Sequence, residues 1–358
     1  MIRIVSRQAL PKRREVFIRI AAVAAAIAAS MCIMALIGYN PFSVFGKILT
    51  GSVGTAYRLR ETINKALLLI MLSLGTCIAF KMKFWNIGAE GQFYMGAFGA
   101  ALTAFGCRQL PAPLLLTMMA IASCVCGGLW ALIPAHLKIK FGTSETLVTL
   151  MLNYVAQKWI GYLQYGPWRD PTGKGFPRME KFTANAVLPK VFGVHIGWIA
   201  VIIFAALLYV MFRKTKFGYE ISAIGESRTT SLYAGINVTR VTVIAIFMSG
   251  ALCGLGGMMQ ASAIENTLSD NISGGLGFTA VITTWLGQLD PFIIVIVSFL
   301  FSMLIQGGTF LQSSLQIPSS MTMILQGIII FFVLGSEFFV RYRLIRTKAQ
   351  SRQKTEAV

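Results

Sequence analysis

Two carboxylates stand inside apolar stretches of this chain, where ionisable side chains are unusual. Glu90 lies within residues 86–92 (NIGAEGQ), and Glu145 begins a long stretch that ends in LNY at 152–154. An ionisable group inside a membrane span costs several kcal/mol, so it usually faces a cavity or a partner. The two carboxylates are therefore candidates for lining a pathway or for fixing a break in a helix.

Amides and hydroxyls extend this polar set. Glu145, Thr149 and Asn153 recur at spacings of four, which places them on one face of a helix. Groups that donate and accept hydrogen bonds suit a neutral, hydroxyl-rich solute. The predicted substrate pathway comprises Asn86, Glu90, Gln92, Glu145, Thr149, Asn153, Thr279 and Thr283.

Helix capping is the competing interpretation of the two carboxylates. Thr143 or Ser144 can cap a helix whose first turn holds Glu145, and Asn86 with Glu90 can be interpreted in the same way. The sequence alone leaves both roles open.

The sequence offers no catalytic or metal-binding constellation. Cys124 and Cys126 have no histidine or carboxylate beside them, and His136 and His195 are isolated near span ends, where we expect interfacial positions. The phosphate-binding pattern Gly-x-x-x-x-Gly-Lys-Ser/Thr does not occur. We expect no catalytic residue, no metal and no cofactor bound by this chain, so any ATP and Mg would be used by a partner.

The composition is that of a membrane protein. Of the 358 residues, 56% are hydrophobic and 13% are charged, against about 25% charged in soluble domains, and the mean hydropathy is +0.69. The net charge of +19 comes from Lys and Arg at span ends and in loops, which argues against nucleic-acid binding. We therefore predict an all-α integral membrane protein in contact with lipid.

Apolar periodicity predicts about ten transmembrane helices. Their approximate ranges are 17–39, 63–80, 86–106, 112–136, 144–164, 196–212, 241–262, 276–289, 292–310 and 319–340. With both termini placed in the cytoplasm, Lys and Arg on the inside outnumber those on the outside about two to one. The predicted domains are a cytoplasmic tail at 1–16, a membrane domain at 17–340 and a basic cytoplasmic tail at 341–358.

Three segments between the spans have a distinct character. Residues 42–57 carry apolar side chains at helical spacing, which fits an interfacial or a packed surface helix. The external segment 164–195 is rich in Gly and Pro and predicts a structured loop, either a docking surface or a plug. The inner segment 213–240 contains a polar, charged stretch from Gly225 to Asn237 that suggests contact with a partner.

Four motifs in order resemble the permease subunits of ATP-binding-cassette importers for nucleosides and simple sugars, in the group that includes ribose and branched-chain amino-acid permeases. The resemblance covers about 60–335 and is carried by NIGAEGQ (86–92), SETLVTLMLNY (144–154), AIGESRTTSLYAGIN (223–237) with SGALCGLGG (249–257), and GLGFTAVITTWLG (275–287). The Glu145 motif is similar to the nucleoside branch.

The resemblance implies an assembly in the bacterial plasma (inner) membrane. Two permease subunits, identical or homologous, would pair with two cytoplasmic ATPase subunits and receive substrate from an extracytoplasmic binding protein. The loop between the sixth and seventh spans would be the coupling segment, with one helix around 226–235 that docks on the ATPase. The implied coupling residues are Gly225, Glu226, Ser227, Arg228, Tyr233 and Gly235.

The chain departs from the family pattern in two places. Ser227 to Leu232 replaces the usual Asn and paired alanines, and Thr283, Thr284 and Trp285 interrupt a run of small aliphatic residues. These differences leave the substrate open. The alternatives are a secondary, ion-coupled transporter of a small polar solute, which needs a midplane ion site, and an integral-membrane enzyme, which needs a catalytic cluster.

Overall fold

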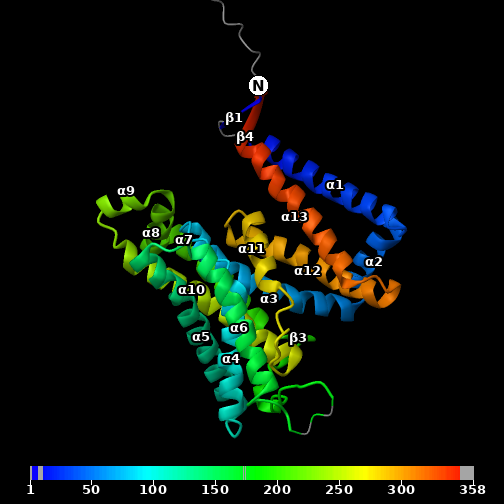
Figure 1. Cartoon of the computed structure of the whole chain (residues 1–358), viewed down its shortest axis with the longest axis vertical. Helices are drawn as coiled ribbons and strands as arrows, with labels where there is room; N and C mark the ends of the chain where they lie inside the picture. The colour runs from blue at the N-terminus through cyan, green and yellow to red at the C-terminus, as the bar shows by residue number, and fades with distance from the viewer. Residues whose placement is uncertain (1, 7–10, 172, 174, 347–358) are drawn as a thin grey trace, which may run out of the picture. The chain divides into compact units, whose positions relative to one another are not determined.

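The computed structural model describes residues 2–6, 11–171, 173 and 175–346, which are mostly helical (Figure 1). The chain separates into two compact units. The larger unit is Leu49–Gly307, and the smaller unit combines Met1–Ile48 with Gly308–Val358. The helical content agrees with the predicted all-α class.

The larger unit carries both candidate sites. Its helices are α3 (Ala56–Lys81), α4 (Ala89–Gly106), α5 (Ala112–Phe141), α6 (Glu145–Tyr165), α7 (Gly197–Lys214), α8 (Lys216–Glu226), α9 (Arg228–Tyr233), α10 (Val238–Met259), α11 (Leu276–Leu286) and the first part of α12 (Pro291–Leu315). A 3-10 turn (Ala184–Ala186) and the strands β2 (Lys190–Val191) and β3 (Val194–His195) lie in the predicted external loop. The loop and the pair α8 and α9 lie at opposite ends of this unit (Figure 1).

The smaller unit brings the two ends of the described chain together. Its helices are α1 (Lys12–Leu36), most of α2 (Pro41–Val53) and α13 (Ser319–Arg341), and α1 packs on α13. Strand β1 (Ile2–Ser6) pairs antiparallel with β4 (Tyr342–Arg346), a pairing that the sequence analysis did not predict. The remainder of the predicted basic tail, 347–358, lies outside the described residues.

Five described helices are long and apolar enough to cross a membrane: α3, α5, α7, α10 with its continuation to Glu265, and α12. A sixth candidate joins Ile20–Leu36 to α2 across a bend of 118°. Helices also occupy the other segments predicted as spans, namely α4, α6, α11 and α13. The chain is a multi-pass membrane protein.

Small residues let the central helices touch backbone to backbone. A Cβ atom on Gly96 of α4 would overlap the backbone of Gly254 in α10, and a Cβ on Gly254 would overlap the carbonyl of Ser123 in α5. Such contacts replace the hydrophobic effect as the packing force between helices in lipid. The core of the larger unit is therefore α3, α4, α5 and α10, whereas α5 and α7 also expose long apolar faces.

A break separates α10 from α11. The last turn of α10 becomes a π-helix (Gln260–Glu265), and the chain turns at Asn266 with a φ of 54°. The Asp270 backbone then binds three side chains: its carbonyl accepts from Tyr94 (2.8 Å) and Gln157 (3.2 Å), and its N–H donates to Gln164 (2.9 Å). These bonds tie the irregular segment to α4 and α6, as membrane proteins require of non-helical backbone.

The predicted external loop is anchored at several points. Arg108, after α4, forms a two-pronged ion pair with Glu180, with N–O distances of 2.9 and 2.6 Å. Trp168 stacks on Phe98 with ring centroids 5.5 Å apart. The segment is therefore a structured surface with a definite shape.

His195 contradicts one expectation. It is fully buried in the β2–β3 hairpin instead of lying at the interface, and its backbone N–H donates to the side chain of Asn64 (3.4 Å). Neither ring nitrogen has a hydrogen-bond partner among the described residues. Burial lowers the pKa of His195 from 6.5 to about 4, so the ring is neutral at neutral pH.

This burial predicts an acid-sensitive contribution to stability. The unfolded histidine takes up a proton near pH 6.5, whereas the folded one resists until about pH 4, so stability is complete above pH 6.5 and falls as the pH drops to 4. The full shift corresponds to about 3 kcal/mol. The test compares the free energy of unfolding of wild type, His195→Gln and the control His136→Gln at pH 7.5 and at pH 4.5. Only His195→Gln should lose less stability than wild type on acidification; equal losses would contradict the assignment.

Candidate functional site

Asn86 is the centre of a buried amide network at the start of α4. Its amide nitrogen donates to Gln92 (3.2 Å) and to Ser249 of α10 (3.3 Å), and its oxygen accepts from the Gln92 amide (3.0 Å) and the Gly88 N–H (3.0 Å). Asn86 and Gln92 therefore bind each other reciprocally. Because these bonds keep buried polar groups paired, they fix the turn between α3 and α4 against α10.

Asn153 holds the same turn from α6. Its side-chain oxygen accepts from the Gly91 N–H (2.8 Å), and its nitrogen donates to the carbonyl of Ile87 (2.9 Å). Glu145, Thr149 and Asn153 all lie on the buried face of α6, as their spacing predicts. The polar stripe therefore faces protein, and it positions the first turn of α4.

Glu90 reaches the start of a different helix. Its carboxylate accepts a hydrogen bond of 2.7 Å from the backbone N–H of Gly277, in the first turn of α11. A negative charge at a helix N-terminus satisfies free N–H groups and complements the helix dipole. Glu90 thus caps α11 rather than its own helix.

Hydroxyl pairs attach the buried face of α11 to α3. Thr283 lies 2.6 Å from Ser73, and Thr284 lies 2.6 Å from Thr76, oxygen to oxygen. Thr279 is partly exposed, and its hydroxyl donates within α11 to Gly275. Ser73 and Thr76 could not be identified from the sequence, because a single hydroxyl on an apolar helix carries no distinctive pattern. Ser249 lies in the motif at 249–257, which gives it no role by itself.

Asn86, Glu90 and Asn153 therefore hold α4 or the turn before it against α10, α11 and α6. The Thr149 hydroxyl bonds within its own helix, and Thr283 binds α3. Most polar side-chain atoms of the predicted pathway residues bind protein partners, and contact of these residues with a solute stays a prediction. Within the described residues, no group of three or more His, Cys, Asp or Glu side chains could hold a metal ion.

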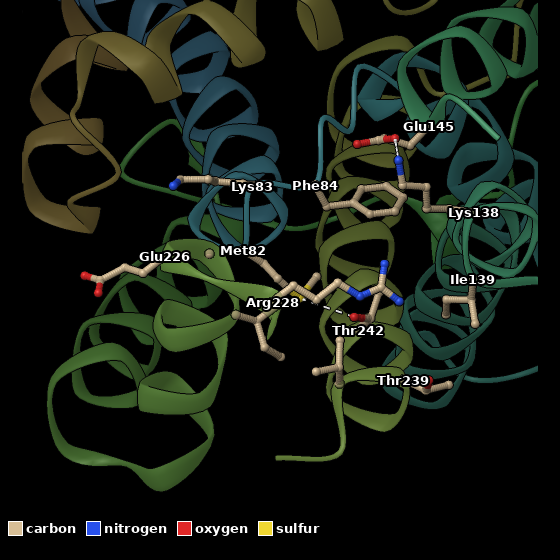
Figure 2. A pocket seen from close by; sticks show the side chains of 13 residues that line it. Met82, Lys83, Phe84, Lys138, Ile139, Glu145, Glu226, Arg228, Thr239 and Thr242 are labelled. Carbon is tan, nitrogen blue, oxygen red and sulfur yellow. Dashed lines mark hydrogen bonds and ion pairs between the residues drawn. The ribbon is translucent and has the colours of Figure 1, made fainter. Parts of the chain in front are cut away.

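Glu145 belongs to a second site, a pocket of about 330 Å³ shown in Figure 2. Its carboxylate binds the ammonium group of Lys138 at 2.7 Å, across the turn between α5 and α6. Ser144 precedes the helix but makes no capping hydrogen bond. The pocket is lined by Met82, Lys83, Phe84, Lys138, Ile139, Glu145, Ile224, Gly225, Glu226, Arg228, Val238, Thr239 and Thr242. The structure thus joins a predicted pathway residue to the predicted coupling segment.

The coupling segment differs from the predicted single helix. Helix α8 ends at Glu226, Ser227 is extended (φ −154°, ψ 111°), and the short α9 follows. The Ser227 hydroxyl accepts from the N–H of Thr230 (3.2 Å), which starts α9 anew. Gly225 lies so close to α3 that a Cβ atom would overlap the carbonyl of Lys81. One side of the segment is therefore seated on α3.

The other side of the segment is open. Tyr233, the last residue of α9, is 93% exposed, and Leu232 is 56% exposed. Gly235 follows with a φ of 78°, a left-handed conformation that favours glycine. Glu226 and Arg228 are exposed as well. The tip of the segment therefore exposes two adjacent side chains with large apolar surfaces.

Known proteins that are similar to this chain belong to the group indicated by the sequence motifs. The family described as the permease component of branched-chain amino acid transport systems matches residues 58–334, close to the range of the sequence resemblance. Three relatives cover most of both chains. They are the glucose ABC transporter permease protein TsgB13 of Haloferax volcanii (30% identity; 90% of this chain, 88% of that protein), the nucleoside ABC transporter permease protein NupB of Lactococcus lactis (28%; 94% and 95%) and the guanosine ABC transporter permease protein NupP of Bacillus subtilis (29%; 91% and 95%).

These matches disfavour the ion-coupled alternative, because the relatives are subunits of ABC transporters. The chain therefore belongs to the family of permease components of branched-chain amino acid transport systems, and it is a membrane permease subunit of an ABC transporter.

Proposed function

We propose that this permease forms the translocation pathway of an ATP-driven importer for a nucleoside or a simple sugar. The observation that carries this proposal is the similarity along nearly the whole chain to permeases named for glucose, nucleosides and guanosine. The polar side chains near the start of α4 are amides, hydroxyls and single carboxylates, which suit a neutral solute rich in hydroxyl groups.

The cytoplasmic ATPase docks on α8 and α9 in this proposal. The exposed Tyr233 and Leu232 give it an apolar anchor, and the seating of Gly225 on α3 passes its movement to the membrane helices. This docking defines the inner face of the membrane. Ten spans with both termini in the cytoplasm then follow from the alternation of loops, and the bias of Lys and Arg supports the same orientation.

A binding protein delivers the solute at the opposite end. The loop at 164–195, held by the Arg108–Glu180 ion pair and the Trp168 stack, offers it a shaped surface. A second permease subunit, identical or homologous, completes the pathway in the bacterial plasma membrane. Asn86, Glu90, Gln92, Asn153, Thr279 and Thr283 act on the solute either directly or by holding the helices that line its path.

Vesicle reconstitution tests the proposal. The permease, its cognate ATPase and its cognate binding protein are reconstituted, and uptake of labelled uridine, guanosine, ribose and glucose is measured with and without ATP. We expect ATP-dependent accumulation of at least one of them, and none from the permease alone. Accumulation by the permease alone, or uptake that a protonophore abolishes while ATP remains, would overturn the proposal.

A further inference from the structure

The pocket of Figure 2 holds one buried carboxylate and two kinds of cation. Glu145 is paired with Lys138 at 2.7 Å, and its side chain is only 11% exposed. The same carboxylate lies close to the backbone amide of Trp85. Trp85 follows Met82 and Phe84, which line the pocket from the turn after α3. Glu145 therefore stands where three segments meet: the end of α5, the start of α6 and the turn after α3.

Of the three cations that line this pocket, Lys138 is paired with Glu145, whereas Arg228 and Lys83 have no ion-pair partner among the described residues. Figure 2 shows its guanidinium group extending across the pocket on the side of Thr242 and Ile139, whereas Glu226 and Lys83 point the opposite way. Arg228 and Glu145 line the same cavity, which has a volume of about 330 Å³. An unpaired guanidinium and a shielded carboxylate thus face one empty space.

A single extended residue, Ser227, separates Arg228 and α9 from α8. On one side of it, Gly225 is seated against the carbonyl of Lys81, so α8 is held to α3. On the other side, α9 has six residues and an exposed tip. A force on the tip of α9 would therefore act across Ser227, next to a helix that is held to α3.

We propose that Arg228 is a movable second counter-ion of Glu145, which binds the carboxylate in one nucleotide state of the transporter and releases it in the other. This inference rests on the proposed function, because it takes the ATPase as the source of the force on α9. When α9 turns toward the turn between α5 and α6, the pocket narrows and the guanidinium joins Lys138 at the carboxylate. Arginine suits this role because its planar fork binds a carboxylate through two parallel hydrogen bonds.

The consequence of this contact reaches the buried network. Glu145 is the first residue of α6, and the same face of that helix carries Thr149 and Asn153. Asn153 holds the backbone of Ile87 and Gly91. A pull on the start of α6 is thereby passed to the first turn of α4 and, through Glu90, to α11. Arg228 is thus a positioning residue that links the coupling segment to the helices around the pathway.

A double-mutant cycle tests the pairing in the complete transporter with its cognate ATPase and binding protein. The variants are Arg228→Gln, Glu145→Gln, both together, and Arg228→Lys. Arg240→Gln is the matched control, because Arg240 is exposed near the start of α10 and lies outside the pocket. The readouts are ATP-dependent uptake of the uridine, guanosine, ribose and glucose panel and the amount of ATPase that co-purifies.

We expect Arg228→Gln to lower uptake about tenfold while most of the ATPase still co-purifies, because Leu232 and Tyr233 remain as its apolar anchor. Arg228→Lys should retain most of the uptake. The double variant should be no worse than Glu145→Gln alone, because both changes remove one contact. Arg240→Gln should stay near wild type. Three results would each overturn the pairing. They are normal uptake by Arg228→Gln, a fold-loss of uptake in the double variant equal to the product of the two single losses, and loss of the ATPase from Arg228→Gln.

A second measurement does not depend on how well Glu145→Gln folds. In a variant without native cysteines, Arg228→Cys and Ile139→Cys place a thiol on each side of the pocket. We expect the disulfide yield to differ several-fold between nucleotide-free and ATP-bound complexes, and an equal yield overturns the movement. If the wild-type complex takes up none of the four solutes with ATP, the proposed function itself is contradicted, and not only the pairing.

Discussion

Replacement of Gly96 by valine is expected to lower the free energy of unfolding by about 3 kcal/mol, at the upper end of overpacking costs. Gly96 of α4 faces Gly254 of α10 so closely that even a Cβ atom would overlap the Gly254 backbone. A flexible side chain could move aside, but a helix backbone cannot move without its neighbours. Gly254 also lies against the carbonyl of Ser123, so a displaced α10 would press on α5.

Gly106→Val is the matched control on the same helix. Gly106 ends α4, and a Cβ atom there has nothing within 4 Å. Thermal unfolding of both purified variants measures the difference, and the amount of monodisperse protein gives an independent check. We expect Gly106→Val to remain near wild type. Equal stability of the two variants would contradict the close contact between Gly96 and Gly254.

Replacement of Glu90 by alanine is expected to reduce ATP-dependent uptake at least tenfold. The Glu90 carboxylate accepts from the Gly277 N–H at 2.7 Å, and its removal leaves the buried start of α11 without this acceptor. A buried unsatisfied N–H group costs about 1–3 kcal/mol. The bonds to Asp270 hold the segment before α11, and the hydroxyl pairs with Ser73 and Thr76 hold the rest of α11. We therefore expect the first turn of α11 to shift rather than the whole unit to unfold.

Two further variants separate charge from hydrogen bonding. Glu90→Gln keeps an oxygen that can accept from Gly277, and we expect an intermediate loss. Glu265→Ala removes an exposed carboxylate near the end of α10 and should transport normally. Uptake is normalised to the amount of protein in the membrane. Equal uptake by Glu90→Ala and Glu265→Ala would contradict the capping of α11.

Local patterns in the sequence predicted the helices and one important face. Apolar runs place helices where the structure has them, and the spacing of Glu145, Thr149 and Asn153 predicts the buried side of α6. These features depend on residues a few positions apart. The break at Ser227 could also have been predicted, because serine is a preferred N-cap residue and its hydroxyl can accept from the N–H three residues later.

Contacts between distant segments could not be predicted in this way. Glu90 and Gly277 are separated by 187 positions, and nothing near either residue identifies the other. Even the pairing of Glu145 with Lys138, which are close in the sequence, depends on the shape of the turn at Gly142, whose φ is 66°. His195 is buried where β3 packs on α3, and its partner Asn64 lies 131 positions earlier in the sequence. Function was easier to infer than geometry, since four ordered motifs indicate a family without fixing any distance.

The glycine contacts of α4, α5 and α10 have a consequence for local opening of the protein, which amide hydrogen exchange measures. Helices that touch through their backbones have no side-chain layer on which to slide, so their amide protons should exchange with solvent only when the whole unit opens. The segment at 227–237 has no such backbone contact with these helices, whereas 266–275 is held to α4 and α6 through the backbone of Asp270. We therefore expect the slowest amide exchange in α4, α5 and α10, and the fastest exchange of these segments at 227–237.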